Sequence, residues 1–215
     1  MNEAATIAIT AAAAAAVDGD TTIARGQARL TDPIPHADPL AAALLQAAEM
    51  LIAHLTPAER DRTGLVLATL HGCLATDWTF DRSRRDEPRF ASPAAFSRTL
   101  PSTLAAEAAL RLTLRGPSVV LTPANHASAA LALHRAAAWM HAFSLTHCIT
   151  GAFDLEENRA RVALVLLETG HPDNHLASLQ LSHSPADKEF TLPDLLAWIR
   201  CPTPVFAPRA GITHP

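Results

Sequence analysis

Asn125, His126 and Ser128 stand together at the start of an alanine-rich segment, and their side chains suggest two different kinds of chemistry. A serine becomes a nucleophile when a base lies within hydrogen-bond reach, so Ser128 with His126 or His134 could form the centre of a small acyl hydrolase or acyltransferase. The Gly-x-Ser-x-Gly turn that exposes such a serine in many hydrolases does not occur in the sequence. Asn125 carries an amide, which can cap a helix but cannot form an acyl thioester.

The other candidate nucleophiles and metal ligands are isolated in the sequence. Cys73 has no identifiable base beside it, so we expect a plain buried thiol. His171 and His175 have a spacing found in metal sites, but neither a cysteine nor an acidic residue follows at ligand spacing, and we expect no metal and no cofactor. The three cysteines show no paired spacing, which favours reduced thiols in the cytoplasm; they are Cys73, Cys148 and Cys201.

The composition favours a soluble globular protein with a substantial core. Of the 215 residues, 49% are hydrophobic and 18% are charged. The net charge of −4 and the scarcity of aromatic residues, 5% with no tyrosine, argue against nucleic-acid binding. No stretch reaches the roughly 18 apolar residues of a membrane span. The N-terminal alanine run lacks the basic segment that precedes a secretory signal.

Short apolar runs alternate with longer amphipathic segments along most of the chain. The runs predict strands at Thr6–Thr10, Thr63–Thr69, Ser118–Thr122, Thr146–Thr150 and Arg161–Glu168. Helices are predicted at Asp38–Leu55, where Asp38 would be the N-cap, at Thr103–Leu114, at Asn125–Phe143 and around Pro193–Arg200. The charged segment Phe80–Arg89 is predicted to be a surface loop. This alternation indicates an α/β domain with a mostly parallel sheet over residues 1–170, followed by an extension at 171–215 with one short helix.

Three short motifs follow one another in the second half of this domain: Ser92-Pro93, Thr99-Leu100-Pro101 and Leu114-Arg115-Gly116-Pro117-Ser118. Their order and spacing resemble those of motifs in the β-ketoacyl synthase family. Counting on from Gly116-Pro117-Ser118, the family's Thr-Ala-Cys-Ala-Ser-Gly is matched by Pro123-Ala-Asn-His-Ala-Ser128. Further on, Thr150-Gly-Ala-Phe-Asp154 is similar to the family's Ala-Gly-Gly-Ala-Glu strand end. The similarity covers roughly residues 5 to 168.

The resemblance implies half of a thiolase-like fold, a mostly parallel five-stranded sheet with a buried central helix. It also implies that Asn125 stands where the family has its catalytic cysteine, beside His126. The family's two active-site histidines belong to a C-terminal half that has no counterpart here, and the connection from Asp154 to Arg161 is only a turn. The chain is therefore similar to chain-length factors, the cysteine-less relatives that pair with an active ketosynthase, and to truncated versions in aryl-polyene clusters. Chain-length factors usually carry glutamine, not asparagine, at this position.

This resemblance predicts a heterodimer with a full-length ketosynthase in type II polyketide, aryl-polyene or fatty-acid-like biosynthesis. The strand before the nucleophile pairs across the two-fold axis in the family, which predicts an interface at Ser118, Val119, Val120 and Leu121. Bulky residues near the remnant of the nucleophile pocket around Asn125 are candidates for lining a tunnel that receives the acyl chain: Trp78, Phe80, Phe96 and Leu104. Four arginines could form a docking patch for an acidic acyl carrier protein, or could belong to a solvated loop of mixed charge: Arg82, Arg84, Arg85 and Arg89. A scaffold that binds a carrier protein without any ketosynthase is a third alternative.

Overall fold

The computed structural model describes residues 7–16, 22–31, 38–86, 89, 91–123, 128–156, 159–170, 176–179, 191–200 and 212–213. Within these ranges eight strands form one sheet, in the order β4-β3-β5-β6-β1-β7-β8, with β2 paired to β1. The strands are β1 Ile7–Ala16, β2 Ile23–Gly26, β3 Thr63–Ala68, β4 Ser118–Leu121, β5 His147–Glu156, β6 Arg159–Thr169, β7 Ala177–Leu179 and β8 Ile212–Thr213.

The five strands predicted from the sequence are β1, β3, β4, β5 and β6, and they are neighbours in the sheet. Four of them run in one direction and only β6 is opposed, which confirms the expected mostly parallel arrangement of these five strands, although the whole eight-stranded sheet is mixed. Strand β3 is parallel to β4 and β5, whereas β6 is antiparallel to both of its neighbours, β5 and β1. The opposed direction of β6 follows from its short connection to β5, because two strands joined by a tight turn must run antiparallel. Strands β2, β7 and β8 extend the sheet and were not predicted.

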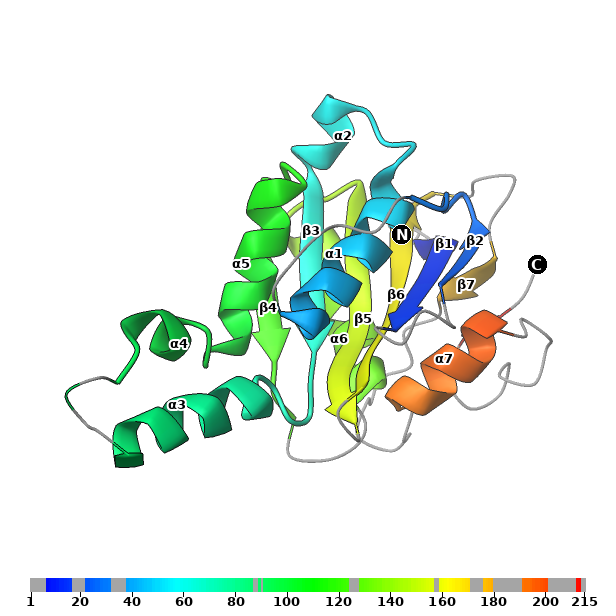
Figure 1. The fold of residues 1–215 in the computed structure, drawn as a ribbon. Helices are drawn as coiled ribbons and strands as arrows, with labels where there is room; N and C mark the ends of the chain where they lie inside the picture. Colours follow the sequence, from blue (N-terminus) through cyan, green and yellow to red (C-terminus); the bar gives the residue numbers. More distant parts are fainter. Residues whose placement is uncertain are drawn as a thin grey trace.

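Helices cover both faces of this sheet, which confirms the α/β class (Figure 1). Helices α1, Pro39–Ile52, and α5, Pro101–Arg111, pack with one face in a single core cluster. Helices α6, Ser128–Ala142, and α7, Leu192–Arg200, pack with the other face in a second cluster. Three shorter or more peripheral helices complete the described set: α2 Pro57–Arg60, α3 Leu74–Asp86 and α4 Pro93–Ser97.

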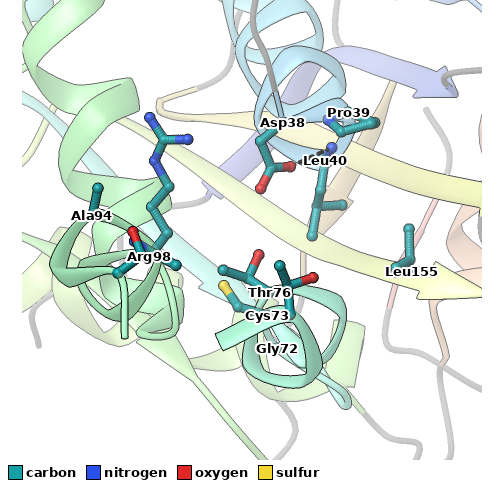
Figure 2. Close-up of a pocket in the computed structure, with 12 residues that line it drawn as sticks. Asp38, Pro39, Leu40, Gly72, Cys73, Thr76, Ala94, Arg98 and Leu155 are labelled. Carbon is teal, nitrogen blue, oxygen red and sulfur yellow. Dashed lines mark hydrogen bonds between the residues drawn. The ribbon is translucent and has the colours of Figure 1, made fainter. Parts of the chain in front are cut away.

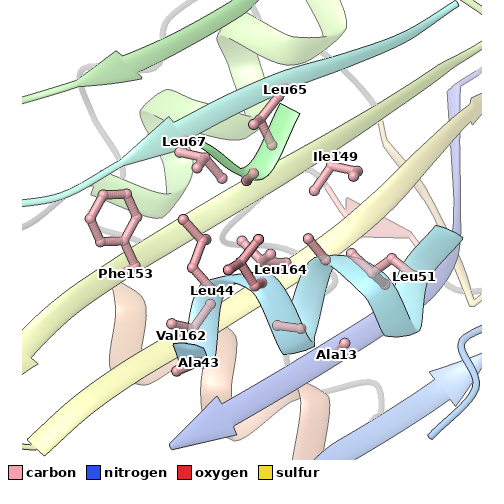
Figure 3. Packing of buried hydrophobic residues seen from close by; sticks show 14 of the residues in the cluster. Ala13, Ala43, Leu44, Leu51, Leu65, Leu67, Ile149, Phe153, Val162 and Leu164 are labelled. Carbon is pink, nitrogen blue, oxygen red and sulfur yellow. The ribbon is translucent and has the colours of Figure 1, made fainter. Parts of the chain in front are cut away.

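Helix α1 lies along the sheet with a continuous apolar face. Figure 3 shows Leu44 and Leu51 of α1 pointing toward side chains of the central strands, among them Leu65 and Leu164. The helix begins where the sequence predicts, because the Asp38 carboxylate accepts hydrogen bonds from the backbone N–H groups of Leu40, at 2.8 Å, and Ala41, at 3.2 Å.

Strand β1 extends through the whole alanine run, six residues beyond the strand predicted at Thr6–Thr10. Alanine has a low intrinsic preference for strands, but Ala11, Ala13 and Ala15 face the α1 side while Ala12 and Ala14 face the α6 side. Both faces of β1 are covered, and small side chains let the covering helices approach closely. Tertiary packing has overridden local propensity here.

The central helix α6 is buried on its sheet side only. Ala129, Ala132, Ala136 and Met140 pack toward β3 and β5, whereas the opposite face includes the exposed Arg135. The expected central helix is thus present and its sheet-facing side is buried, while α7 is the only other described helix packed on this side of the sheet.

The extension after residue 170 contributes α7 to the same core. Leu192, Leu195 and Trp198 are buried in the α6–α7 cluster. Arg25 of β2 donates hydrogen bonds to the carbonyls of Ile199, at 3.0 Å, and Arg200, at 2.6 Å, which ties the end of α7 to the sheet. The described parts of the chain contain no helix both long and apolar enough to cross a membrane.

Candidate functional site

The residues that the sequence places at the nucleophile position, Asn125 and His126, lie outside the described residues. Described structure resumes at Ser128, the first residue of α6, three positions after Asn125. The Ser128 side chain is buried, at 3% exposure, and it lines a cavity of about 150 Å³ at this end of the helix. The cavity is lined by Leu70, His71, Ser128, Asp154, Thr191, Leu192 and Pro193.

Asp154, at the end of the buried part of β5, holds the loop that follows β3 against this cavity. Its Oδ1 accepts hydrogen bonds from the Thr69 hydroxyl, at 2.8 Å, and from the backbone N–H of His71, at 2.9 Å. Its Oδ2 accepts one from the N–H of Leu70, at 3.0 Å, and the Thr69 hydroxyl oxygen accepts one from the N–H of Gly72, at 2.8 Å. The carboxylate is 4% exposed, and these donors satisfy it without a cation.

His71 brings an imidazole to the same cavity. Its Nδ1 lies 3.5 Å from Oδ1 of Asp154, and its side chain is 45% exposed. Serine, histidine and aspartate therefore line one small cavity at the N-terminus of a helix, an arrangement that can support acyl transfer if the histidine reaches the serine hydroxyl. The sequence suggested His126 or His134 as the base; His134 is not among the residues that line the cavity. His71 was missed because 57 residues separate it from Ser128, and no local motif joins them.

The two described thiols are held in their protonated form. Cys73 is buried, as expected, and lines a larger cavity of about 550 Å³ between the start of α1 and helices α3 and α4 (Figure 2). Burial, followed by the negative charges of Asp38 and Asp77, raises the pKa of the Cys73 thiol to about 11. Burial raises the pKa of Cys148 to about 12. Neither thiol is a thiolate near neutral pH, so neither replaces the missing nucleophile.

The Leu114-Arg-Gly-Pro-Ser118 motif has a structural role in this fold. A Cβ atom on Gly116 would lie 2.3 Å from the carbonyl oxygen of Thr63, so only glycine allows the two backbones to approach this closely. The carbonyl of Pro117 then accepts a hydrogen bond of 3.0 Å from the N–H of Leu65, which sets the register between β3 and β4.

The predicted interface residues form β4, which lies at one edge of the sheet and pairs only with β3 among the described strands. Val120 packs against the α1–α5 cluster, and Val119 and Leu121 pack against the α6–α7 cluster. Ser118 is exposed. The two faces of the strand are thus covered within the chain, and its free backbone edge is the surface available for pairing.

The four tunnel candidates lie on three helices, α3, α4 and α5. Trp78 and Phe96 are 66% and 58% exposed, on α3 and α4. Phe80 packs against Phe96 with ring centroids 5.3 Å apart, and Leu104 is a core residue, 7% exposed, on α5. None of the four lines either cavity described above.

The segment predicted to be a charged loop is mostly helical, because α3 continues to Asp86. Ion pairs one helical turn apart support it: Asp81 binds Arg84 at 2.8 Å and Arg85 at 2.7 Å. Arg82 and Arg89 are exposed. Arg82, Arg84 and Arg85 thus lie along a helix, with two of them paired to a carboxylate, whereas Arg89 lies beyond its end.

Among the described residues, no group of three or more histidine, cysteine or acidic side chains could hold a metal ion, and His171 and His175 lie outside them.

The strand order β4-β3-β5-β6-β1, with β6 opposed and helices on both faces, defines an α/β domain of the thiolase-like type. A family model described as the β-ketoacyl synthase N-terminal domain matches residues 6–168. The chain therefore belongs to the β-ketoacyl synthase family through this domain, which confirms the resemblance seen in the sequence.

Solved structures of this family share the fold at low sequence identity. The chain matches "the ishigamide ketosynthase/chain length factor" with a TM-score of 0.62 and 18% identity, covering 81% of this chain and 65% of that one. It matches the ketosynthase (ApeO) in complex with its chain length factor (ApeC) from Xenorhabdus doucetiae with a TM-score of 0.65 and 14% identity, covering 91% and 92%. A type II acyl-carrier protein complex with its ketosynthase, AntDE:AntF, gives a TM-score of 0.58 and 14% identity, covering 81% and 62%.

The lengths of these structures differ. The chain spans just under two thirds of the matched ishigamide chain and nearly the whole of the matched Xenorhabdus chain. No curated protein matches the sequence.

Proposed function

We propose that this chain is a non-catalytic, chain-length-factor-like subunit that pairs with an active full-length ketosynthase in a type II polyketide, aryl-polyene or fatty-acid-like system in the cytoplasm. The observation that carries the proposal is Asn125 at the position where the family has its catalytic cysteine. An amide has no nucleophilic electron pair for thioester exchange, so the chain cannot accept the acyl group that a ketosynthase condenses.

The state of the described thiols supports the absence of condensing chemistry. The pKa values of about 11 for Cys73 and about 12 for Cys148 leave both almost fully protonated at neutral pH. Burial opposes ionisation of both thiols, and the negative charges of Asp38 and Asp77 add to this effect at Cys73, whereas a reactive cysteine needs surroundings that stabilise the thiolate.

The open edge of β4 supports the pairing. An edge strand with free N–H and C=O groups is a template for strand addition from another chain. One matched solved structure is a ketosynthase with its chain length factor, and the matched chain there has nearly the length of this one. A subunit of this length is thus compatible with such a complex.

Incubation with an acylated carrier protein or acyl thioester tests the loss of chemistry. Mass spectrometry of this chain with its ketosynthase is expected to find the acyl adduct on the ketosynthase alone. A covalent thioester on this chain would contradict the proposal.

Val120→Asp tests the pairing. The Val120 side chain packs against the α1–α5 cluster, so a carboxylate there would lie without a counter-charge beneath the strand that pairs, and co-purification with the ketosynthase is expected to be lost. Circular dichroism of the variant checks that the chain still folds, so that the loss reports on pairing. Leu30→Asp is the matched control, because Leu30 is 70% exposed and lies outside β4. An intact complex with the Val120 variant would contradict strand pairing at β4.

A small acyl hydrolase is the second candidate, favoured by the shared cavity of Ser128, His71 and Asp154. In this alternative Ser128 attacks the acyl carbonyl, and His71 takes the hydroxyl proton and gives it to the leaving thiolate, which leaves an acyl-serine ester. Water, deprotonated by His71, then attacks this ester and releases the free acid and the serine hydroxyl, while Asp154 orients the imidazole throughout. Thioester turnover by the purified chain, lost in both Ser128→Ala and His71→Gln, would favour the hydrolase over the subunit. Turnover unchanged in either variant would eliminate it.

A further inference from the structure

The larger cavity, of about 550 Å³, lies where α1 begins and where helices α3 and α4 approach it (Figure 2). Its walls combine apolar and polar groups that come from segments far apart in the sequence. Leu40 of α1, Ala95 of α4 and Leu155 of β5 supply apolar surface, while Cys73 and Thr76 add a thiol and a hydroxyl. A cavity of this volume with a mixed lining is typical of a small-molecule site.

The sheet separates this cavity from the position of the missing nucleophile. Leu40 and Cys73 belong to the core cluster of α1 and α5, whereas α6, which begins at Ser128, packs on the other face of the sheet. Asp154 and Leu155 are neighbours in β5, and successive side chains of a strand point to opposite faces. Asp154 accordingly lines the small cavity beside Ser128 and Leu155 lines the larger one, so the two are distinct sites.

Arg98, the C-cap residue of α4, brings a positive charge to the larger cavity. Within the part of the chain that the structure describes, its guanidinium group forms neither an ion pair nor a hydrogen bond. Asp38 also lines the cavity, but its Oδ1 already accepts the N–H groups of Leu40 and Ala41. An anionic ligand would give Arg98 the acceptor that it lacks, whereas a cationic ligand would compete with these backbone donors for Asp38.

We infer that this cavity binds a small amphipathic carboxylate, with the anionic group at Arg98 and the apolar body against Leu40, Ala95 and Leu155. The inference goes beyond the proposed pairing with a ketosynthase and does not depend on it. The hydroxyl of Thr76, which has no hydrogen-bond partner among the described residues, supplies a further donor. Since its pKa is about 11, the Cys73 thiol is a neutral part of the wall at pH 7, and the ligand is held without a covalent bond.

Three probes of similar length that differ in charge test the site: hexanoate, hexanol and hexylamine. Isotope-labelled leucine methyl groups in this chain alone report binding by NMR to the full chain, with or without its ketosynthase. Hexanoate is expected to shift the resonances of Leu40 and Leu155, with a dissociation constant on the order of 1 mM for a ligand of this size. Hexanol is expected to bind about tenfold more weakly, and hexylamine more weakly still. The resonances of Leu133, buried on the α6 side, are expected to stay unchanged.

Two substitutions in α4 and its C-cap separate the role of charge from that of space. Arg98→Gln is expected to weaken hexanoate binding about tenfold, because the ligand loses its charged partner. Ala95→Phe places a ring in the cavity and is expected to abolish binding. Arg135→Gln and Ala138→Phe make the same changes at exposed positions of α6, across the sheet, and are expected to leave the affinity unchanged. Circular dichroism checks that all four variants remain folded.

Saturable shifts at Leu40 and Leu155 that respond to the substitutions in α4 and its C-cap, but not to those in α6, would support the site. Tighter binding of hexylamine than of hexanoate would overturn the inferred charge of the ligand. The absence of saturable shifts, or an affinity that neither Arg98→Gln nor Ala95→Phe changes, would overturn the site itself. A chain that pairs with its ketosynthase but binds no hexanoate would refute this inference alone, and the reverse result would refute only the proposed function.

Discussion

Asp154 organises the described part of the candidate site through hydrogen bonds to a loop more than 80 residues away in the sequence. Three donors converge on its buried carboxylate: the hydroxyl of Thr69 and the backbone N–H groups of Leu70 and His71. The sequence marked Asp154 only as the end of a strand similar to one in ketosynthases. In the fold this acidic residue fixes the β3–α3 loop, and it does so whether or not the chain carries out any chemistry.

Asp154→Ala is expected to lower the free energy of unfolding by about 2–4 kcal/mol, because buried donors would lose their acceptor. Urea unfolding followed by circular dichroism measures the change. Asp61→Ala is the control: Asp61 forms an exposed ion pair with Arg115 at 3.3 Å, and its loss is expected to change stability by less than about 1 kcal/mol. Equal effects of the two substitutions would refute the anchoring role of Asp154.

The buried thiols predict an unusual loss of stability in alkali. Thiols that ionise at an ordinary pKa of 9.0 when unfolded have pKa values of about 11 for Cys73 and about 12 for Cys148 in the fold. Because the fold favours the protonated thiols, their contribution to the free energy of unfolding is complete below pH 9. It is lost as the pH rises through 11 to 12. The chain has no tyrosine and Lys188 as its only lysine, so few other side chains titrate in this range.

Urea unfolding between pH 8 and 11 is therefore expected to show stability falling above pH 9. Cys148→Ala removes one of the groups responsible, so its stability is expected to fall less steeply with pH, whatever its value at pH 8. An identical slope in the variant and the unaltered chain would contradict the assignment.

At the scale of the elements, the sequence predicted what local patterns specify. The N-cap at Asp38 and the strands β1, β3, β4, β5 and β6 follow from capping and from short apolar runs, and the structure confirms them. The extension of β1 through the alanine run and the helix through Arg84 and Arg85 were not predicted. The extension of β1 depends on the helices that cover both of its faces. The helix is supported by the ion pairs of Asp81 with Arg84 and Arg85, and these side chains become neighbours only once the helix has formed.

The ion pairs of α3 bear on carrier-protein docking. Asp81 neutralises part of the charge of Arg84 and Arg85, so the basic face is weaker than the sequence indicates. If an acidic carrier protein docks here, Asp81→Asn is expected to strengthen binding severalfold at low salt, and Arg84→Glu with Arg85→Glu to weaken it. Titration at two salt concentrations measures both effects. Affinities that respond to neither change would place the docking site elsewhere.

At the scale of the whole molecule, the covering of the sheet is uneven. The α1–α5 face has a layer of helices packed on it, whereas on the other face α6 keeps Arg135 and Ala138 exposed. The edge at β4 and the apolar side chains of helices α3 and α4 are also exposed. The sequence could indicate a half-fold through its resemblance to ketosynthases, but not which surfaces the half-fold leaves open. That depends on how segments distant in sequence cover one another, including the burial of α7 on the α6 side.

A partner that binds only the folded chain must stabilise it by mass action, so the melting temperature is expected to rise with ketosynthase concentration. At a concentration one hundred times the dissociation constant, the gain is about 2.7 kcal/mol, or roughly 5–10 °C for a chain of this size. Fluorotryptophan incorporated into this chain alone, at its three tryptophans, lets fluorine NMR follow its unfolding beside an unlabelled partner. Val120→Asp, which disrupts the paired edge, is expected to melt at one temperature at every ketosynthase concentration. A melting temperature of the unaltered chain that does not change with ketosynthase concentration would mean that the ketosynthase does not bind the folded chain, because stabilisation is a necessary consequence of such binding.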